Sequence, residues 1–90
     1  MLDLKQTSHF KKDLRRMVKR GADMSLLDDV ILMLRERKTL PKRYEDHPLS
    51  GNWSGYRDCH IQPDWLLIYR VDDETLILTA TRTGSHCDLF

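Results

Sequence analysis

The chain has 90 residues, of which 40% are hydrophobic and 32% are charged, and its formal net charge at pH 7 is +1. This length predicts one domain over residues 1–90 with a thin core, because so short a chain buries only about 60–65% of its unfolded surface. No apolar run approaches the ~20 residues that cross a bilayer, and the N-terminus lacks a signal-peptide apolar stretch, so we expect a cytoplasmic protein with no membrane partner.

The first part of the chain predicts a strand followed by two helices. Residues 2–6 alternate as in a short strand. From His9 onward, apolar residues recur at helical spacing, with Ser8 as the expected N-cap and Gly21 just past the helix end. A second amphipathic helix follows, capped by Asp23 or Ser25.

After Pro41 the periodicity changes from helices to strands. Residues 44–50 are interpreted as a loop, and three strands follow over residues 52–61, 65–71 and 75–83. The order β-α-α-β-β-β predicts an α+β fold, in which a helical hairpin packs on a mostly antiparallel four-stranded sheet. Trp53 and Tyr56 are interpreted as sheet residues.

The charge is unevenly distributed along the chain. Residues 1–22 hold seven Lys/Arg against two acids, whereas the remaining residues hold eight against twelve. This asymmetry indicates a polyanionic or acidic partner, although a solvated helix face explains it equally well. The candidate contact residues on the first helix are Lys11, Lys12, Arg15, Arg16, Lys19 and Arg20.

Two segments of the second half resemble a known family. DHPLSGNWSGYRDCHIQPDWLLIYR, residues 46–70, and RTGSHCDLF, residues 82–90, closely resemble the YafQ-like toxins of the RelE/ParE superfamily. The resemblance implies a RelE-like fold and a ribosome-dependent endoribonuclease that cuts mRNA in the ribosomal A site and is held inactive by an antitoxin. It implies no cofactor or metal.

The same resemblance implies the site residues. The catalytic set falls on His47, His60, Asp64, Arg82 and His86, and Trp65 and Phe90 would position the substrate. The residue types suit metal-independent RNA cleavage. Histidine can act as base and acid near neutral pH, and the planar guanidinium of arginine matches phosphate oxygens. The sequence does not assign base and acid to individual histidines.

Each site residue also has a structural interpretation. Asp64 could simply make a turn, and Trp65 shares the strand parity of Leu67 and Tyr69, so core packing is as plausible for it as stacking on a base. Arg82 shares the parity of Leu78 and could cover the edge of the core.

Rival functions remain open at this stage. Cys59, His60, His86 and Cys87 could in principle form a zinc site, but adjacent strand residues point to opposite faces, which argues against it. With no export signal, both cysteines are expected to be free thiols. A ParE-like toxin that inhibits a protein such as a topoisomerase without cutting RNA is the alternative function, and an inactive relative acting only in autoregulation is a third.

Overall fold

A computed structural model describes all 90 residues as an α+β fold. A five-stranded sheet of order β1-β5-β4-β3-β2 forms its centre, with β1 and β5 parallel and the other neighbours antiparallel. The elements in chain order are β1 (Asp3–Gln6), α1 (Ser8–Lys19), α2 (Met24–Arg35), η1 (Lys42–Tyr44), β2 (His47–Pro48), η2 (Gly51–Trp53), β3 (Arg57–Gln62), β4 (Trp65–Asp72), β5 (Ile77–Gly84) and α3 (His86–Leu89).

The predicted fold class is confirmed, and two short elements add to the prediction. The segment interpreted as a loop, residues 44–50, contains β2, whose two residues pair with β3 and make a fifth strand. Residues beyond the last predicted strand form the short helix α3. Neither element is long enough to produce a hydrophobic period in the sequence. No helix has the length and apolar character that crossing a membrane requires.

The start of α1 is fixed to the sheet by Thr7. Its hydroxyl oxygen accepts a hydrogen bond from the backbone N–H of Phe10 at 3.0 Å and donates to the carbonyl of Thr81 at 2.7 Å. Thr7 is therefore the N-cap, and the prediction of Ser8 as cap was wrong by one residue. The cap prediction for α2 is confirmed at Asp23, and Gly21 has the expected positive φ of 80°.

The strand predicted over residues 52–61 begins later than expected, at Arg57. Gly51 and Gly55 have φ values of 62° and 92°, which take the backbone out of the extended region on both sides of Trp53. Trp53 therefore lies in the turn η2, and Tyr56 precedes the strand, so the interpretation of both as sheet residues was wrong. The loop is closed by a hydrogen bond from the Leu49 N–H to the Tyr56 carbonyl, 2.9 Å long.

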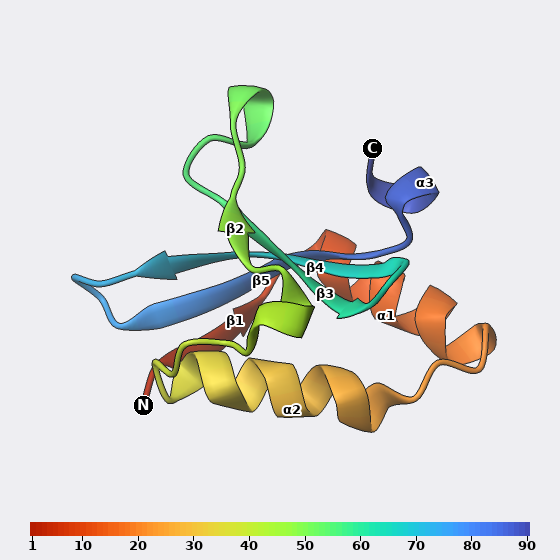
Figure 1. Cartoon of the computed structure of the whole chain (residues 1–90), viewed down its shortest axis with the longest axis horizontal. Helices are drawn as coiled ribbons and strands as arrows, with labels where there is room; N and C mark the ends of the chain where they lie inside the picture. Colours follow the sequence, from red (N-terminus) through yellow and green to blue (C-terminus); the bar gives the residue numbers. More distant parts are fainter.

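The sheet has one face covered by helices and one largely open face. Along β4, Trp65, Leu67 and Tyr69 enter the main core beneath α1 and α2, whereas Leu66 and Ile68 point the other way and meet Leu89 of α3. Figure 1 shows α3 and the loop with η2 rising on the side of the sheet opposite α2. We call this second side of the sheet the open face.

A β-bulge decides which face Arg82 occupies. Ile68 pairs with Arg82 and the next residue, Tyr69, pairs with Ala80, so Thr81 is an extra residue in β5. The bulge moves Arg82 onto the open face with Ile68. The expected shared parity of Arg82 with Leu78 was therefore wrong, because it assumed an uninterrupted strand.

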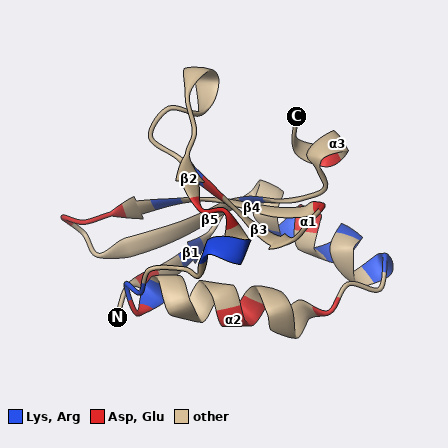
Figure 2. Cartoon of the chain, in the orientation of Figure 1, with Lys and Arg blue, Asp and Glu red and all other residues tan.

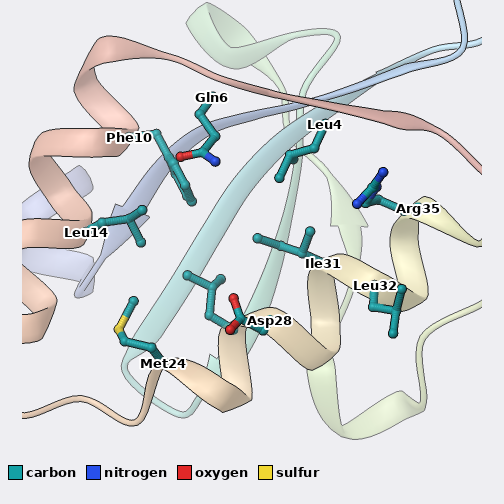
Figure 3. Close-up of a pocket in the computed structure, with 10 residues that line it drawn as sticks. Leu4, Gln6, Phe10, Leu14, Met24, Asp28, Ile31, Leu32 and Arg35 are labelled. Atoms are coloured by element: carbon teal, nitrogen blue, oxygen red, sulfur yellow. The ribbon is translucent and has the colours of Figure 1, made fainter.

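A pocket of about 280 Å³ opens between α1, α2 and β1 on the helix-covered side (Figure 3). Its walls are mainly apolar and include Leu4, Phe10, Leu14, Met24 and Ile31, with Asp28 and Arg35 among its polar members. None of the predicted site residues lines it. The candidate chemistry lies on the open face instead.

Candidate active site

Strand β3 brings two titratable side chains to the open face. Cys59 enters the main core and is fully buried, so its neighbours Asp58 and His60 project to the other side of the sheet. His47 of β2 pairs directly with Asp58 in the sheet register. The HPL and GYRDCH motifs thus meet because β2 and β3 are hydrogen-bonded neighbours.

His86 reaches this cluster through the fold of the tail. Ser85 caps α3 in a reciprocal capping box with Asp88. Asp64, in the turn between β3 and β4, accepts hydrogen bonds from the backbone N–H of His86 at 3.0 Å and from its Nδ1 at 2.7 Å. The rings of His60 and His86 then lie edge to face with centroids 5.6 Å apart.

The partners of the three rings determine which ring nitrogens are free. Nδ1 of His47 lies 2.6 Å from the Glu45 carbonyl oxygen, and Nδ1 of His86 bonds to the Asp64 carboxylate. Both oxygens can only accept, so each Nδ1 carries the proton and donates. Nδ1 of His60 lies 3.2 Å from the Glu45 carboxylate. In each ring the Nε2 is left available for chemistry.

The sequence analysis did not consider Asp58, which lies at the centre of this cluster. Its side chain is buried, and its Oδ1 has no hydrogen-bond partner. Burial raises the pKa of the Asp58 carboxyl, and the nearby imidazoles of His47, His60 and His86 act in the opposite direction. Its position two residues before His60, on the same strand face, could have revealed it.

Hydrogen bonds also shift the proton equilibria of Asp64 and Arg82. The backbone N–H and the ring of His86 lower the pKa of Asp64, so this carboxylate is ionised at neutral pH. Nε and Nη2 of Arg82 donate to Asp13 of α1 at 2.7 and 3.2 Å, which raises the pKa of Arg82. Nη1 of Arg82 forms no hydrogen bond within the protein.

The two aromatic residues predicted to position the substrate differ in exposure. Trp65 is 2% exposed and belongs to the main core, where its Nε1 donates to Thr83 Oγ1 at 2.9 Å. The structure thus favours core packing for Trp65, and its role in positioning the substrate stays a prediction. Phe90 is 60% exposed at the end of the chain and packs edge-on against Trp53, with ring centroids 6.4 Å apart.

The basic residues of α1 divide into two groups. Figure 2 shows Lys and Arg on α1 and acidic residues on α2. Arg16 and Arg20 form ion pairs with Asp88, at 3.2 and 2.6 Å, and so fix α3 to the helix. The other four candidates are exposed and form no ion pair: Lys11, Lys12, Arg15 and Lys19.

The zinc alternative does not fit the geometry. Cys59 and His60 point to opposite faces, and no three His, Cys, Asp or Glu side chains converge in a way that could hold a metal ion. Both cysteines are free thiols, with Cys59 buried and Cys87 exposed.

A family model for the bacterial toxin of the type II toxin-antitoxin system, YafQ, matches residues 2–90. The chain belongs to this family. The mRNA interferase toxin YafQ of Escherichia coli strain K12 is 42% identical over 89 residues, which cover 98% of this chain and 95% of that relative.

Two solved structures have the same fold. A metal-bound toxin from Helicobacter pylori superposes with a TM-score of 0.95 at 40% identity, and the match covers 100% of both chains. The toxin in the E. coli DinJ-YafQ complex gives a TM-score of 0.90 at 41% identity and covers 100% of this chain and 99% of that one.

Proposed function

We propose that this chain is the toxin of a type II toxin-antitoxin pair and that it cuts mRNA on the ribosome by histidine acid-base catalysis. The observation that carries the proposal is the pair of imidazoles from His60 and His86, 5.6 Å apart on the open face. Each has its Nδ1 directed to an oxygen acceptor, Glu45 for His60 and Asp64 for His86, and each has a free Nε2. Two such groups are what cleavage at a 2′-hydroxyl requires.

The reaction proceeds by transfer of two protons. One imidazole Nε2 takes the proton of the 2′-hydroxyl, whose oxygen attacks the adjacent phosphorus. The P–O bond to the 5′-oxygen breaks as the other, protonated imidazole donates its proton to that oxygen. The products are a 2′,3′-cyclic phosphate and a 5′-hydroxyl.

The remaining residues support this proton transfer. Asp64 holds the His86 ring through Nδ1 and stabilises its protonated form. Arg82 offers its free Nη1 to the phosphate as negative charge develops. His47 lies opposite Asp58 in the register and is assigned to contact the phosphate or sugar, and Phe90 offers an exposed ring for a base.

The antitoxin and the ribosome are the proposed partners. The related toxin YafQ has been crystallised with DinJ, and here we infer a cognate antitoxin in the same role. The unpaired cations of α1, Lys11, Lys12, Arg15 and Lys19, suit ribosomal RNA or an acidic antitoxin segment. Cytoplasmic location follows from ribosome-bound mRNA as substrate.

Primer extension on a reporter mRNA after brief induction tests the function. The wild-type chain should give discrete cuts within the translated region that disappear when the start codon is removed. His86→Ala should abolish them, because losing one acid-base group reduces the rate about 10²–10⁴-fold. Cys87→Ala, at the exposed neighbouring position, is the matched control and should cut normally. Growth arrest with an intact transcript would favour the protein-inhibiting alternative.

Chelation tests the metal-independent mechanism. A related toxin from H. pylori has been crystallised with a metal, whereas no three suitable side chains converge in this protein. Toxin bound to programmed ribosomes should continue to cut mRNA after a chelator has removed the free divalent ions. The chelator is used at a concentration that leaves the ribosomes intact. A 3′-hydroxyl product would contradict the mechanism.

A further inference from the structure

A groove on the open face extends away from the histidines toward the other edge of the sheet. It consists of two adjoining pockets of about 490 and about 280 Å³, which share Thr7 and Thr81. The first pocket includes Trp53 and Arg82, and the second includes Tyr56 and Arg70. We call the two together the Trp53–Arg70 groove. The reaction described above uses none of it except Arg82.

Helix α3 and a row of ring contacts connect the candidate active site to the groove. His86 and Phe90 lie at the two ends of α3, and the Phe90 ring packs against Trp53 at 6.4 Å between centroids. Trp53 packs edge-on against Tyr56 at 5.4 Å, and the Arg70 guanidinium lies 6.0 Å from the Tyr56 ring centroid. The exposed ring of Phe90 therefore lies next to Trp53, at the end of the groove that is nearer to the candidate active site.

The far end of the groove is cationic and rich in donors. In the sheet register, Thr79 pairs with Lys5 on one side and Arg70 on the other, so these three side chains form a row across β1, β5 and β4. Neither Lys5 nor Arg70 forms an ion pair. Asp72 also lines this end, and its carboxylate accepts the N–H groups of Glu74 and Thr75, so two cations and one carboxylate leave a net positive charge there.

We propose that the Trp53–Arg70 groove binds the nucleotides next to the scissile one in the same single-stranded RNA. A base stacks on Trp53, and the phosphates that follow lie along Thr79, Arg70 and Lys5. Aromatic platforms beside cations that track the backbone are the usual means of holding unpaired strands. This proposal rests on the proposed ribonuclease function and adds a subsite that sets the path of the strand.

A cycle that pairs protein variants with RNA changes tests the contact at Trp53. Ribosomes programmed with mRNAs that carry one abasic nucleotide, walked along both sides of the cut, are treated with wild type or Trp53→Ala. At one flanking position, base removal should lower kcat/KM about tenfold for wild type and have no further effect on Trp53→Ala, because the stacked base is already lost. If the decreases in kcat/KM from Trp53→Ala and from base removal are additive at every position, no base stacks on Trp53 and the proposed contact is wrong.

Arg70 provides a second cycle that does not depend on the folding of the loop. Arg70→Ala is an exposed change, and its partner is a methylphosphonate that removes one charge from the RNA backbone. At one flanking phosphate, the decrease in kcat/KM from Arg70→Ala and the decrease from the methylphosphonate should not be additive. Arg43→Ala is the matched control, because Arg43 is also exposed and stacks on a tyrosine, Tyr44, outside the groove. Its effect should add to that of every methylphosphonate.

The cleavage of unmodified mRNA separates this proposal from the function on which it rests. If wild type cuts, His86→Ala does not, and all cycles are additive, the groove proposal fails while the ribonuclease stands. If wild type does not cut at all, both fail. Additive cycles combined with weaker binding of the antitoxin by Trp53→Ala and Arg70→Ala would show that the groove holds a protein and would overturn the RNA assignment.

Discussion

Oδ2 of Asp13 accepts a hydrogen bond from Nε of Arg82 at 2.7 Å, which joins α1 to the end of β5 across 69 positions of the chain. Asp13 is only 2% exposed and also accepts the backbone N–H of Thr83 at 3.1 Å. Two bonds to adjacent residues fix both the strand end and the direction of the guanidinium. The position of the proposed phosphate-binding arginine is thus set from the first helix.

Replacing Asp13 should destabilise the protein. Asp13→Asn removes the charge from a buried acceptor of Arg82 and Thr83, and we expect a loss of roughly 2–3 kcal/mol in the free energy of unfolding. Urea denaturation followed by circular dichroism measures it. Asp29→Asn, at an exposed position on α2 without an ion pair, should change stability by less than about 0.5 kcal/mol. Equal stability of the two variants would contradict the role of Asp13.

Asp88 should make stability depend on pH in the acid range. The hydrogen bond from Arg20, together with those from Ser85, holds the pKa of Asp88 far below its usual value. A carboxyl whose pKa is lowered by folding stabilises the native state above its unfolded pKa near 4, and this contribution is lost as the pH falls further. Asp88→Asn should therefore lower stability at pH 7 by about 1 kcal/mol, since both arginines are partly exposed.

Urea midpoints at pH 7 and pH 3 measure this effect. The gap between wild type and Asp88→Asn should narrow at pH 3. Asp73→Asn provides the control, because the pair of Asp73 with Arg37 lies on an exposed turn and should matter little. A gap that stays constant over the pH range would contradict a stabilising contribution from the ionised Asp88 carboxylate.

The two cysteines should react at very different rates. Cys59 is fully buried, and burial strongly raises the pKa of its thiol, whereas Cys87 is exposed on α3. Ellman's reagent should label one thiol in the native protein and both in urea. Cys87→Ala should leave no fast-reacting thiol, and rapid labelling in that variant would contradict the burial of Cys59.

Trp65 and Phe90 should separate stability from cleavage. Trp65→Phe removes the hydrogen bond to Thr83 inside the core, so it should lower stability by about 1 kcal/mol and leave cleavage by the folded protein intact. Phe90→Ala, at an exposed terminal ring, should leave stability nearly unchanged and reduce cleavage. Thermal melts and primer extension read the two effects. The reverse pattern would support Trp65 as the residue that positions the substrate.

Local patterns in the sequence were enough to predict most of the architecture. Helical spacing of apolar residues predicted α1 and α2, and strand-like runs bounded by turn signals predicted β4 and β5 to within two residues. These features depend on neighbours in the chain, so periodicity reports them directly. Elements of two to four residues, such as β2 and α3, depend on tertiary partners and leave no such pattern.

The sequence by itself determined which residue types are available for chemistry: three histidines and Arg82, in segments that resemble the YafQ-like toxins. Only the tertiary structure decided which of them meet and how they are held. The bulge at Thr81 placed Arg82 on the open face, strand pairing placed Asp58 opposite His47, and the turn at Asp64 brought His86 to His60. Trp65 went to the core for the same reason, because strand register, which a single sequence does not encode locally, assigns each side chain to a face.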